Sequence, residues 1–583
     1  MGHRASPGEE GIQGVRWLLP DRTEAGASEL AALLDLHPLA ARVLWNRGYT
    51  TASSAGSFLA DRLSDLPDPF RMKGLAAAVD RLGRALRQGE KITLWGDYDV
   101  DGVCSTALLS LVLRELGATV ATYIPHRIGE GYGLNREAIE RIASDGTRLL
   151  VTLDCGITSH AEVARAKELG LDVVVVDHHA VPDTLPPADA VLNPLQPGCA
   201  YPTSWLCAAG VCFNLCMGLR KRLRDDGYFA TRAEPNLKAY LDLVALATVA
   251  DVVPLQGANR ILVKAGLEAL TAARRPGVRA LKEVAGLGAE AEVTTSQVGF
   301  RLGPRINAAG RMDDAAVGLR LLCAETIEEA RPLAEALDRA NAERQAVEQQ
   351  ILQEALAQAE AKREARGLVL HSEGWHPGVI GIVASRVVER FHRPTVLVAM
   401  KDGVGRGSAR SIEGFHLVEA LRTCADHLAK FGGHKAAAGL TVNADRLPTF
   451  SDAFAAVAAE RLSDDDLLPR CRVDAVLSPK EVDARAVSAI GRLGPFGAGN
   501  PEPVLASRYL VTRPRVLQSK RGGPGHLKLA LESAPHLDAI GFGMEEKLAL
   551  TEGPVDLAFQ VGFDEYRGVR RISLRLKDVR PSL

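Results

Sequence analysis

The chain of 583 residues has no long hydrophobic run, and this absence excludes one large class of proteins. No apolar stretch approaches the length of about 18 residues that a membrane-spanning helix needs, so we expect no membrane association. Residues 1–14 are polar and rich in glycine and lack the apolar core of a signal peptide, which favours a cytoplasmic location. Hydrophobic residues make up 46% and charged residues 24% of the chain, as in an ordinary globular protein.

Cysteine is also scarce, and the nine cysteines are too scattered and odd in number for a disulfide framework. Three of them, Cys207, Cys212 and Cys216, lie near Cys199, but no CxxC pair accompanies them as in many zinc sites. Residues 208–213 have the composition of a buried helix. We therefore expect these thiols to pack in the core as small apolar side chains.

The net charge is only −2, so neither sign of charge is in excess. A nucleic-acid-binding groove needs only a local basic lining, and near neutrality therefore neither favours nor excludes a nucleic-acid ligand. Local patches of residues must decide the question.

Acidic and histidine residues follow three short apolar runs in the first third of the chain. The runs and the residues behind them are 92–95 with Asp97 and Asp99, 149–153 with Asp154, and 173–176 with Asp177, His178 and His179. Short continuous apolar runs are typical of buried parallel strands, whose carboxyl ends form the binding edge of a sheet. Asp251, expected at a helix end, would reach the same crevice. Converging carboxylates and imidazole predict a site for two divalent cations, and hence phosphoryl hydrolysis.

Strand and helix patterns alternate along the first half of the chain and predict an α/β fold of the doubly wound type. Residues 326–366 contain no glycine and only one proline, Pro332, which predicts one long helix that this proline could break. The fold class is α/β, with two α/β lobes joined by the long helix and a C-terminal all-β barrel. The expected parts are an N-terminal extension at 1–65, a catalytic domain at 66–325, the connecting helix at 326–366, a second α/β domain at 367–465 and the barrel at 466–583.

Four motifs in this order resemble the DHH phosphoesterase superfamily: DYDVDG at 97–102, DCG at 154–156, DHH at 177–179 and LATVADVVPL at 246–255. From residue 66 to residue 501 the chain is similar to the RecJ branch of that superfamily. The resemblance implies a single-strand-specific exonuclease that digests DNA from the 5′ end to 5′-mononucleotides, processively, as the strand threads between two lobes. It also implies a role in DNA repair and recombination, with a single-strand-binding protein and a recombination helicase as partners, and we expect a monomer.

The resemblance further implies which residues bind two Mn²⁺ or Mg²⁺ ions. Asp97 and Asp154 would hold one ion, and Asp99, Asp154, His178 and Asp251 the other. Some relatives have a histidine two residues before the first aspartate, where this chain has Trp95, so the first ion would keep more waters. His179 would contact phosphate or support a ligand, and Asp177 would orient a histidine. Asp101, before Gly102, is interpreted as a helix cap.

Several segments have side chains suited to phosphate. Residues 303–311 resemble the family's GPRxNAAGR stretch and place Arg305, Asn307 and Arg311 in an expected loop between glycines. Arg127 stands where the family keeps an arginine near the phosphate pocket.

The second α/β unit contains three glycine-rich segments that resemble the DHH-associated domain of the family. Residues 374–381 place His376 at a helix start, whereas 405–411 and 432–439 place Ser408, Arg410 and His434 in flexible backbone. By the resemblance, Ser408 and Arg410 would hold the 5′-terminal phosphate.

The C-terminal barrel would resemble an oligonucleotide-binding (OB) fold, with residues 494–503 as its family marker. Its strands carry basic residues beside Tyr509 and Leu510: Arg508, Arg513, Arg515, Lys520, Arg521 and Lys528. Such a lining suits single strands through backbone charge and base stacking.

Two other functions fit parts of the pattern. A DHH-type hydrolase of short oligonucleotides, cyclic dinucleotides or pyrophosphate would usually be smaller and lack the barrel. A catalytically inactive DNA-binding relative would have lost the acidic ligands, all of which are present here.

Overall fold

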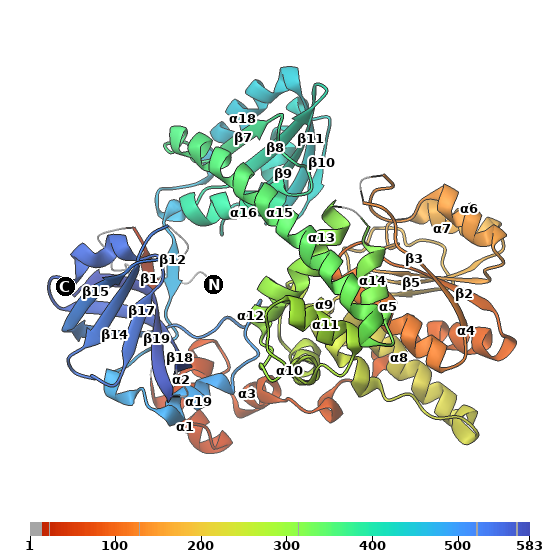
Figure 1. Cartoon of the computed structure of the whole chain (residues 1–583), viewed down its shortest axis with the longest axis horizontal. Coiled ribbons are helices and arrows are strands. Elements are labelled where there is room, and N and C mark those ends of the chain that lie inside the picture. The colour runs from red at the N-terminus through yellow and green to blue at the C-terminus, as the bar shows by residue number, and fades with distance from the viewer. Residues whose placement is uncertain are drawn as a thin grey trace. The chain divides into compact units, whose positions relative to one another are not determined.

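The computed structural model describes residues 14–582 apart from 22–23, 128, 313, 520–522 and 567–568. The chain divides into two compact units, and Figure 1 labels helices and strands of both. The first unit comprises Gly56–Ala342 together with Gly494–Pro501, and the second unit comprises the remaining described residues. Among the described helices, none is both long and apolar enough to cross a membrane.

The first unit is built on a five-stranded parallel sheet with the order β3-β2-β4-β5-β6. Its strands are β2 (Lys91–Trp95), β3 (Thr119–Tyr123), β4 (Leu149–Leu153), β5 (Asp172–Val176) and β6 (Ala190–Leu192). Alternate side chains of β4 enter different cores: Val151 packs beneath one face of the sheet and Leu150 above the other. Because both faces are covered, these strands are apolar throughout, and the doubly wound prediction is confirmed.

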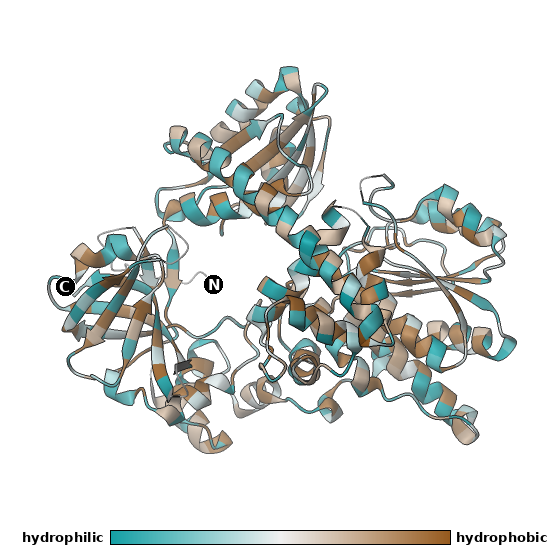
Figure 2. Ribbon diagram, viewed as in Figure 1, coloured by the Kyte–Doolittle hydropathy of each residue, from teal (hydrophilic) through white to brown (hydrophobic). Residues whose placement is uncertain are grey.

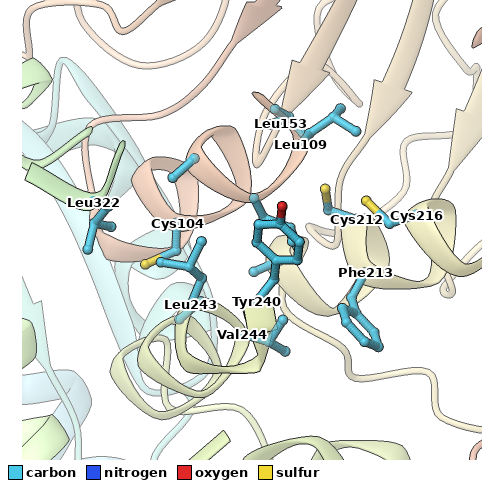
Figure 3. Packing of buried hydrophobic residues seen from close by; sticks show 14 of the residues in the cluster. Cys104, Leu109, Leu153, Cys212, Phe213, Cys216, Tyr240, Leu243, Val244 and Leu322 are labelled. Carbon is cyan, nitrogen blue, oxygen red and sulfur yellow. The ribbon is translucent and has the colours of Figure 1, made fainter. Parts of the chain in front are cut away.

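Helices cover both faces of this sheet. One face packs against α4 (Leu75–Gln88), α5 (Val100–Glu115), α8 (Ala208–Asp225) and α9 (Leu241–Ala250), and the other against α6 (Arg136–Ser144) and α7 (His160–Glu168). Figure 3 shows Cys104, Cys212 and Cys216 among the apolar side chains of the larger core. Cys207 is also buried in this core, and the partly exposed Cys199 packs against the edge of the core. The prediction that these thiols pack as core residues is confirmed.

The rest of the first unit is helical and includes the segment predicted to be a phosphate-binding loop. It consists of α10 (Ala258–Ala272), α11 (Pro276–Val284), α12 (Thr295–Gln297), a π-helical turn at Val298–Leu302, α13 (Gly303–Met312) and α14 (Ala316–Cys323). The prediction of a loop at 303–311 is wrong, because α13 occupies it. Pro304 has no amide hydrogen and cannot donate a helical hydrogen bond. The π-helical turn directly before α13 is where the regular series of backbone hydrogen bonds is interrupted.

The predicted long helix is present as α15 (Ile327–Ala361) and continues through Pro332 without a break. Hydrophilic and hydrophobic residues alternate along it in Figure 2. Its apolar residues Leu337, Ile351 and Ala355 are buried, and their spacing places them on one narrow stripe of the helix.

The second unit contains two sheets. The smaller has the order β10-β11-β9-β8-β7 and is formed by β7 (Leu368–Ser372), β8 (Thr395–Lys401), β9 (Val404–Arg410), β10 (Lys430–Gly433) and β11 (Ala437–Asn443), with α16 (Ile380–Phe391), α17 (Leu417–Thr423) and α18 (Leu447–Arg461). Two glycine-rich segments predicted to be flexible are therefore mostly strands of one sheet. Glycine suits this sheet because Gly407 lies directly against the Leu440 side chain.

The larger sheet of the second unit is the predicted β-rich C-terminal region. Its order is β13-β14-β18-β19-β17-β16-β15, formed by β13 (Ala475–Val476), β14 (Leu505–Leu510), β15 (Thr512–Leu517), β16 (His526–Leu531), β17 (Asp538–Gly541), β18 (Val555–Tyr566) and β19 (Val569–Pro581), with α19 (Ala484–Gly491) beside it. Arg515 on β15 lies opposite Lys528 on β16. The basic residues Lys520 and Arg521 lie outside the described residues.

The N-terminal segment packs on this C-terminal region. It contains β1 (Arg16–Leu18), which pairs with β12 (Arg470–Arg472), and the helices α1 (Glu24–Leu34) and α2 (Pro38–Asn46). The next helix, α3 (Ala52–Leu59), includes Gly56, where the first unit begins. The buried Trp17 indole donates a 2.5 Å hydrogen bond to Asp578, and Arg47 forms a 2.7 Å ion pair with Asp474. These contacts join residues far apart in the sequence.

Candidate metal centre

The first two acidic residues of the predicted site lie where β2 ends and α5 begins. Asp99 is the N-cap of α5, and its carboxylate accepts hydrogen bonds from the amides of Asp101 at 2.9 Å and Gly102 at 3.1 Å. These bonds turn the chain directly after the strand. Asp97 and Asp99 are thereby both held at the carboxyl edge of the sheet.

Asp101 acts as a cap, as predicted, but of another helix. Its buried carboxylate accepts hydrogen bonds from the amides of Ala208 at 2.6 Å and Ala209 at 2.8 Å, at the start of α8. One of its oxygens also lies 3.7 Å from His178 Nε2. Asp101 therefore contributes negative charge to the site as well as capping α8.

Asp154 follows β4 with a φ of +66°, which is uncommon outside glycine. Its amide donates to the carbonyl of Val176 at 3.0 Å, and its own carbonyl accepts a hydrogen bond from Tyr132 Oη at 3.1 Å. The side chain is almost fully buried. This turn directs the carboxylate of Asp154 toward the same edge as Asp97.

The DHH segment after β5 is arranged by its aspartate. Asp177 accepts hydrogen bonds from the backbone amides of His178 at 2.8 Å and His179 at 3.1 Å, and it lies 2.8 Å from His179 Nδ1. The prediction that Asp177 orients a histidine is confirmed. His178, in turn, places its Nε2 3.2 Å from Asp154 and 3.6 Å from Asp251.

The sequence-predicted ligands therefore converge on one place in the first unit. Three overlapping groups have ligand atoms within 4.8 Å of one another: Asp97, Asp99 and Asp154; Asp154, His178 and His179; and Asp101, His178 and Asp251. Together the three groups contain five carboxylates and two imidazoles, and this predominance of oxygen donors suits Mg²⁺ or Mn²⁺.

Burial makes the ionised form of these clustered carboxylates unfavourable in the absence of cations. Burial and the charge of Asp99 raise the pKa of Asp97 to about 8, and burial and the charge of Asp101 raise the pKa of Asp251 to about 9. Burial and the surrounding carboxylates raise the pKa of Asp154 well above its ordinary value. Three of the buried oxygens accept no hydrogen bond from the described residues: Asp97 Oδ1, Asp154 Oδ1 and Asp251 Oδ2. Orphaned buried carboxylate oxygens of this kind fit divalent cations.

The two histidines have opposite protonation tendencies. Burial and the neighbouring His179 lower the pKa of His178 to about 4, so its imidazole is neutral at physiological pH and can bind a metal. Burial opposes charge on His179, but the hydrogen bond to Asp177 raises its pKa to about 9. His179 is thus a cation beside the acidic cluster.

The residues predicted to bind phosphate in the first unit have different surroundings. Asn307 Oδ1 accepts a hydrogen bond from the amide of Val100 at 3.1 Å, so this residue supports the turn that carries Asp99. The Arg305 guanidinium is held by Asp338 at 2.9 Å and by two backbone carbonyls, away from the acidic cluster. Arg127 lies over the ring of Tyr98 at 4.7 Å.

Both Arg127 and Arg311 act electrostatically on Tyr98, the residue between the first two aspartates. Their charges oppose the effect of burial, which raises the pKa of Tyr98 to about 12. Arg127 therefore lies beside the first two aspartates and Arg311 acts on the same tyrosine, whereas Arg305 is bonded to Asp338.

In the second unit, Ser408 and Arg410 lie together on β9 against the start of α16. Arg410 donates to Ser408 Oγ at 3.3 Å and to the carbonyl of Ala409 at 2.9 Å, and burial lowers its pKa. A side chain on Gly381 would lie 2.9 Å from Ser408 Oγ and 3.2 Å from Arg410 Nη2. His376 Nδ1 accepts a hydrogen bond from the amide of Gly378 at 3.1 Å in the turn before α16.

His434 lies exposed in the turn between β10 and β11, where its amide donates to the carbonyl of Ala437 at 2.8 Å. Ala437 pairs with Arg410 across the sheet. His434 is therefore close to the β9 residues in the pairing pattern of the sheet.

Sequence reasoning missed Tyr132 as a site residue. Its hydroxyl bonds the Asp154 carbonyl, lies 3.3 Å from His179 Nδ1, and its ring meets the His179 ring edge-on at 5.7 Å. A tyrosine between Gly131 and Gly133 was the available signal. Trp95 offers no ligand, because an indole N–H can only donate a hydrogen bond. Its side chain is fully buried and packs on Tyr123 with ring centroids 4.5 Å apart.

Three regions of the chain match known domain families. Residues 91–248 match the DHH family N-terminal domain, 364–460 the DHHA1 domain and 473–578 the RecJ OB domain. The single-stranded-DNA-specific exonuclease RecJ of Escherichia coli K12 is 40% identical over 567 residues, which cover 94% of this chain and 96% of that protein. The chain belongs to the RecJ family. Like RecJ it has the DHH domain with its acidic motifs intact, and it is a metal-dependent exonuclease.

Solved RecJ structures agree with this assignment. RecJ of Thermus thermophilus in complex with Mn²⁺ matches with a TM-score of 0.83 and 34% identity, covering 98% of this chain and 80% of that chain. The same protein in complex with Mg²⁺ matches with a TM-score of 0.77 and 32% identity, covering 98% and 79%. The donor set described above fits both of these ions.

Proposed function

We propose that this protein is an exonuclease specific for single-stranded DNA that degrades the strand from its 5′ end and releases 5′-mononucleotides. The observation that carries the proposal is the convergence of Asp97, Asp99, Asp154, His178 and Asp251 in a chain related over nearly its whole length to such exonucleases. Intact acidic motifs argue against an inactive relative, and the additional β-rich region argues against an enzyme for dinucleotides or pyrophosphate.

Two ions of Mn²⁺ or Mg²⁺ would supply the activated water and stabilise charge on the attacking and leaving oxygens. Asp97 and Asp154 would hold one ion, and Asp99, Asp154, His178 and Asp251 the other. No protein nucleophile is then required. Neutral His178 offers its ring nitrogen as a ligand, and the low pKa of its imidazole supports that role.

The cationic side chains around the cluster would bind and orient the phosphodiester. Protonated His179, held by Asp177, is placed to contact a non-bridging phosphate oxygen, and Arg127 and Arg311 add positive charge near Tyr98. Asn307 would act by supporting the metal-binding turn. Because Arg305 is already held by Asp338, we assign it a structural contribution to this site.

Selection of the 5′ end would come from the second unit. Arg410 is partly buried, and no carboxylate of the described part of the chain pairs with it. It lies with Ser408 beside the start of α16, where the positive end of the helix dipole favours an anion. We propose that these two residues, together with His376 and His434, bind the terminal 5′-phosphate. Arg515 and Lys528, on neighbouring strands of the C-terminal sheet, would contact the strand backbone.

The biological setting follows from the substrate. We propose action in DNA repair and recombination in the cytoplasm, as a monomer, alongside a single-strand-binding protein and a recombination helicase that would unwind the duplex.

Digestion of end-labelled single strands tests the proposal. With Mn²⁺ or Mg²⁺ we expect a 5′ label to appear first as mononucleotide, whereas a 3′ label stays on progressively shorter strands, and chelation stops both. A duplex of the same sequence is the control and should survive. Binding without cleavage would favour the inactive relative, and hydrolysis of dinucleotides alone would favour the enzyme for small substrates.

A Gly381→Ala substitution tests the 5′-phosphate site. The added methyl group would lie 2.9 Å from Ser408 Oγ and 3.2 Å from Arg410 Nη2, so it should displace both side chains. We expect the preference for a 5′-phosphorylated over a 5′-hydroxyl strand to fall by about tenfold, equivalent to the loss of roughly one charge-assisted hydrogen bond.

The matched control for this experiment is Gly56→Ala, another helical glycine, whose added methyl group would meet no atom within 4 Å. It should leave the preference unchanged. An unaltered preference in Gly381→Ala would move the 5′-phosphate site away from Ser408 and Arg410.

A further inference from the structure

A short segment from the C-terminal part of the chain folds with the metal centre. Gly494–Pro501 belongs to the first unit, although the residues on both sides of it, up to Leu493 and from Glu502, belong to the second. We call it the docking loop. Its contacts fall on Thr295 and on residues 254–256, which lie shortly after Asp251, the metal-ligand candidate at the end of α9.

Three carbonyls of the docking loop accept hydrogen bonds from the first unit. They are Phe496 O from Thr295 Oγ1 at 2.6 Å, Ala498 O from Leu255 N at 2.8 Å and Gly499 O from Gln256 Nε2 at 2.6 Å. The loop also holds its own shape, since Gly497 and Asn500 exchange backbone hydrogen bonds and Asn500 Nδ2 donates to Pro495 O at 2.9 Å. A preformed loop therefore lies against residues 254–256.

The two glycines of the loop make this contact close. A Cβ atom on Gly497 would lie 2.8 Å from Leu255 Cδ1, and one on Gly499 would lie 2.8 Å from Pro254 Cβ. Gly499 also has a φ of +68°, which favours glycine. A side chain on Gly497 would require Leu255 to shift, whereas one on Gly499 would meet the rigid Pro254 ring and an unfavourable φ.

The segment that the loop contacts is strained. Asp251 ends α9, and the next residue, Val252, has a φ of +59° with its side chain 70% exposed. Positive φ is unfavourable for a β-branched residue and persists only where neighbouring contacts impose it. The exposed Val252 side chain supplies little packing of its own. Its amide donates to the carbonyl of Val249 at 3.3 Å, which ties the turn to α9, and further contacts come from the residues that follow.

Contacts on both sides hold the turn. The fully buried Asn259 donates to the carbonyl of Pro254 at 3.0 Å from α10, and the docking loop holds Leu255 and Gln256. Asp251 is only a few residues away, and its carboxylate lies 3.6 Å from His178 Nε2. Release of the loop would let the strained turn relax and would move that carboxylate.

We propose that the docking loop positions Asp251 for metal binding, with Thr295, Gln256 and Gly499 as positioning residues. This inference rests on the proposed function only in taking Asp251 as a metal ligand. It assigns a catalytic consequence to a segment that lies far from the acidic motifs in the sequence. The C-terminal part of the chain would thus contribute to the metal centre itself as well as to DNA binding.

Manganese binding to the full-length protein, followed by the electron paramagnetic resonance of free Mn²⁺, tests the proposal without relying on activity. In Gly499→Ala the methyl group collides with Pro254, and we expect the weaker of the bound ions to lose about tenfold in affinity, as when a supporting contact of a metal ligand is removed. The matched control is Gly543→Ala. Gly543 has the same φ of +68° but no atom within 4 Å of an added methyl group, so its Mn²⁺ affinity should not change.

A second pair of variants, at Thr295, tests the same contact in case Gly499→Ala does not fold. Thr295→Val removes only the hydroxyl that bonds Phe496 O and should weaken Mn²⁺ binding severalfold, whereas Thr295→Ser keeps the hydroxyl and should bind as wild type does. A loop with a merely structural role would lower the melting temperature of the metal-free protein in Thr295→Val and leave Mn²⁺ affinity intact. That result would overturn the inference.

The proposed function and this inference fail in different ways. A wild-type protein that binds no Mn²⁺, or binds it without cleaving single strands, contradicts the proposed function. A wild-type protein that does both, with unchanged Mn²⁺ affinity in Gly499→Ala and Thr295→Val, contradicts only the role of the docking loop.

Discussion

Replacement of Asp154 by asparagine should reduce cleavage of single-stranded DNA by about 10³-fold or more, a loss typical of removing a principal charge-stabilising group. Asp154 takes part in two of the three ligand groups, so it is the candidate bridge between two ions. Asparagine keeps the shape of the side chain but removes the charge and one of the two anionic oxygens. Single-turnover cleavage of a labelled strand with saturating Mn²⁺ measures the effect.

The control for Asp154→Asn is Asp172→Asn. Asp172 begins β5 at the opposite edge of the same sheet, where it pairs with Arg81 at 2.6 Å and Lys167 at 2.9 Å. Its replacement should alter stability slightly and leave cleavage nearly intact. Equal activity of the two variants would show that the acidic cluster is not the catalytic centre.

The metal-free protein should lose stability steadily as the pH rises from 6 to 9. The folded-state pKa values of Asp97 and Asp251, about 8 and about 9, lie far above the ordinary value of 3.8. Between these limits the folded protein holds protons that the unfolded chain has released. The stabilisation is complete below pH 4 and is lost as the pH rises through 8 and 9, at about 1.4 kcal/mol per pH unit for each such proton.

His179 acts in the same direction, because its pKa rises from 6.5 to about 9 on folding. Its contribution to stability is complete below pH 6.5 and disappears above pH 9. Thermal unfolding in a chelating buffer across this range measures the combined effect.

Added Mn²⁺ should abolish this decline, because a bound cation takes the place of the protons and stabilises the ionised carboxylates. The variant Asp154→Asn provides a further comparison, since one fewer carboxylate in the cluster should flatten the pH dependence of the metal-free protein. A melting temperature of the metal-free wild type that rises between pH 6 and 9 would contradict the raised pKa values.

Local sequence patterns predicted the convergence of the acidic residues and His178 for a simple physical reason. Runs such as 149–153 are apolar throughout because both faces of a parallel sheet are covered, and residues directly behind such runs must lie at its carboxyl edge. The convergence of Asp97, Asp154 and His178 therefore does not depend on how the covering helices pack. The long helix was predictable too, since its length and stripe of apolar residues depend only on neighbours in the sequence.

Glycine-rich segments were harder to interpret. Residues 405–411 and 432–439 were predicted to be flexible, yet most of them lie in paired strands. Glycine also occurs in a strand where a neighbouring side chain occupies the space of a Cβ atom, as Leu440 does beside Gly407. At 303–311 the proline and glycines suggested a loop, but the preceding π turn absorbs the missing hydrogen bond of Pro304 and the helix continues. In each case the competing explanation depends on a neighbour that the sequence does not reveal.

The sequence by itself determined the α/β class, the acidic edge and the chemistry of its ligands, because these follow from period, composition and the order of strands and acids. Only the tertiary structure decided that Tyr132 bonds Asp154, that Arg305 is held by Asp338 and that the docking loop lies against the turn after Asp251. Such contacts join residues far apart in the chain through the shape of a particular fold. No local pattern encodes them, because their free energy arises only when distant segments meet.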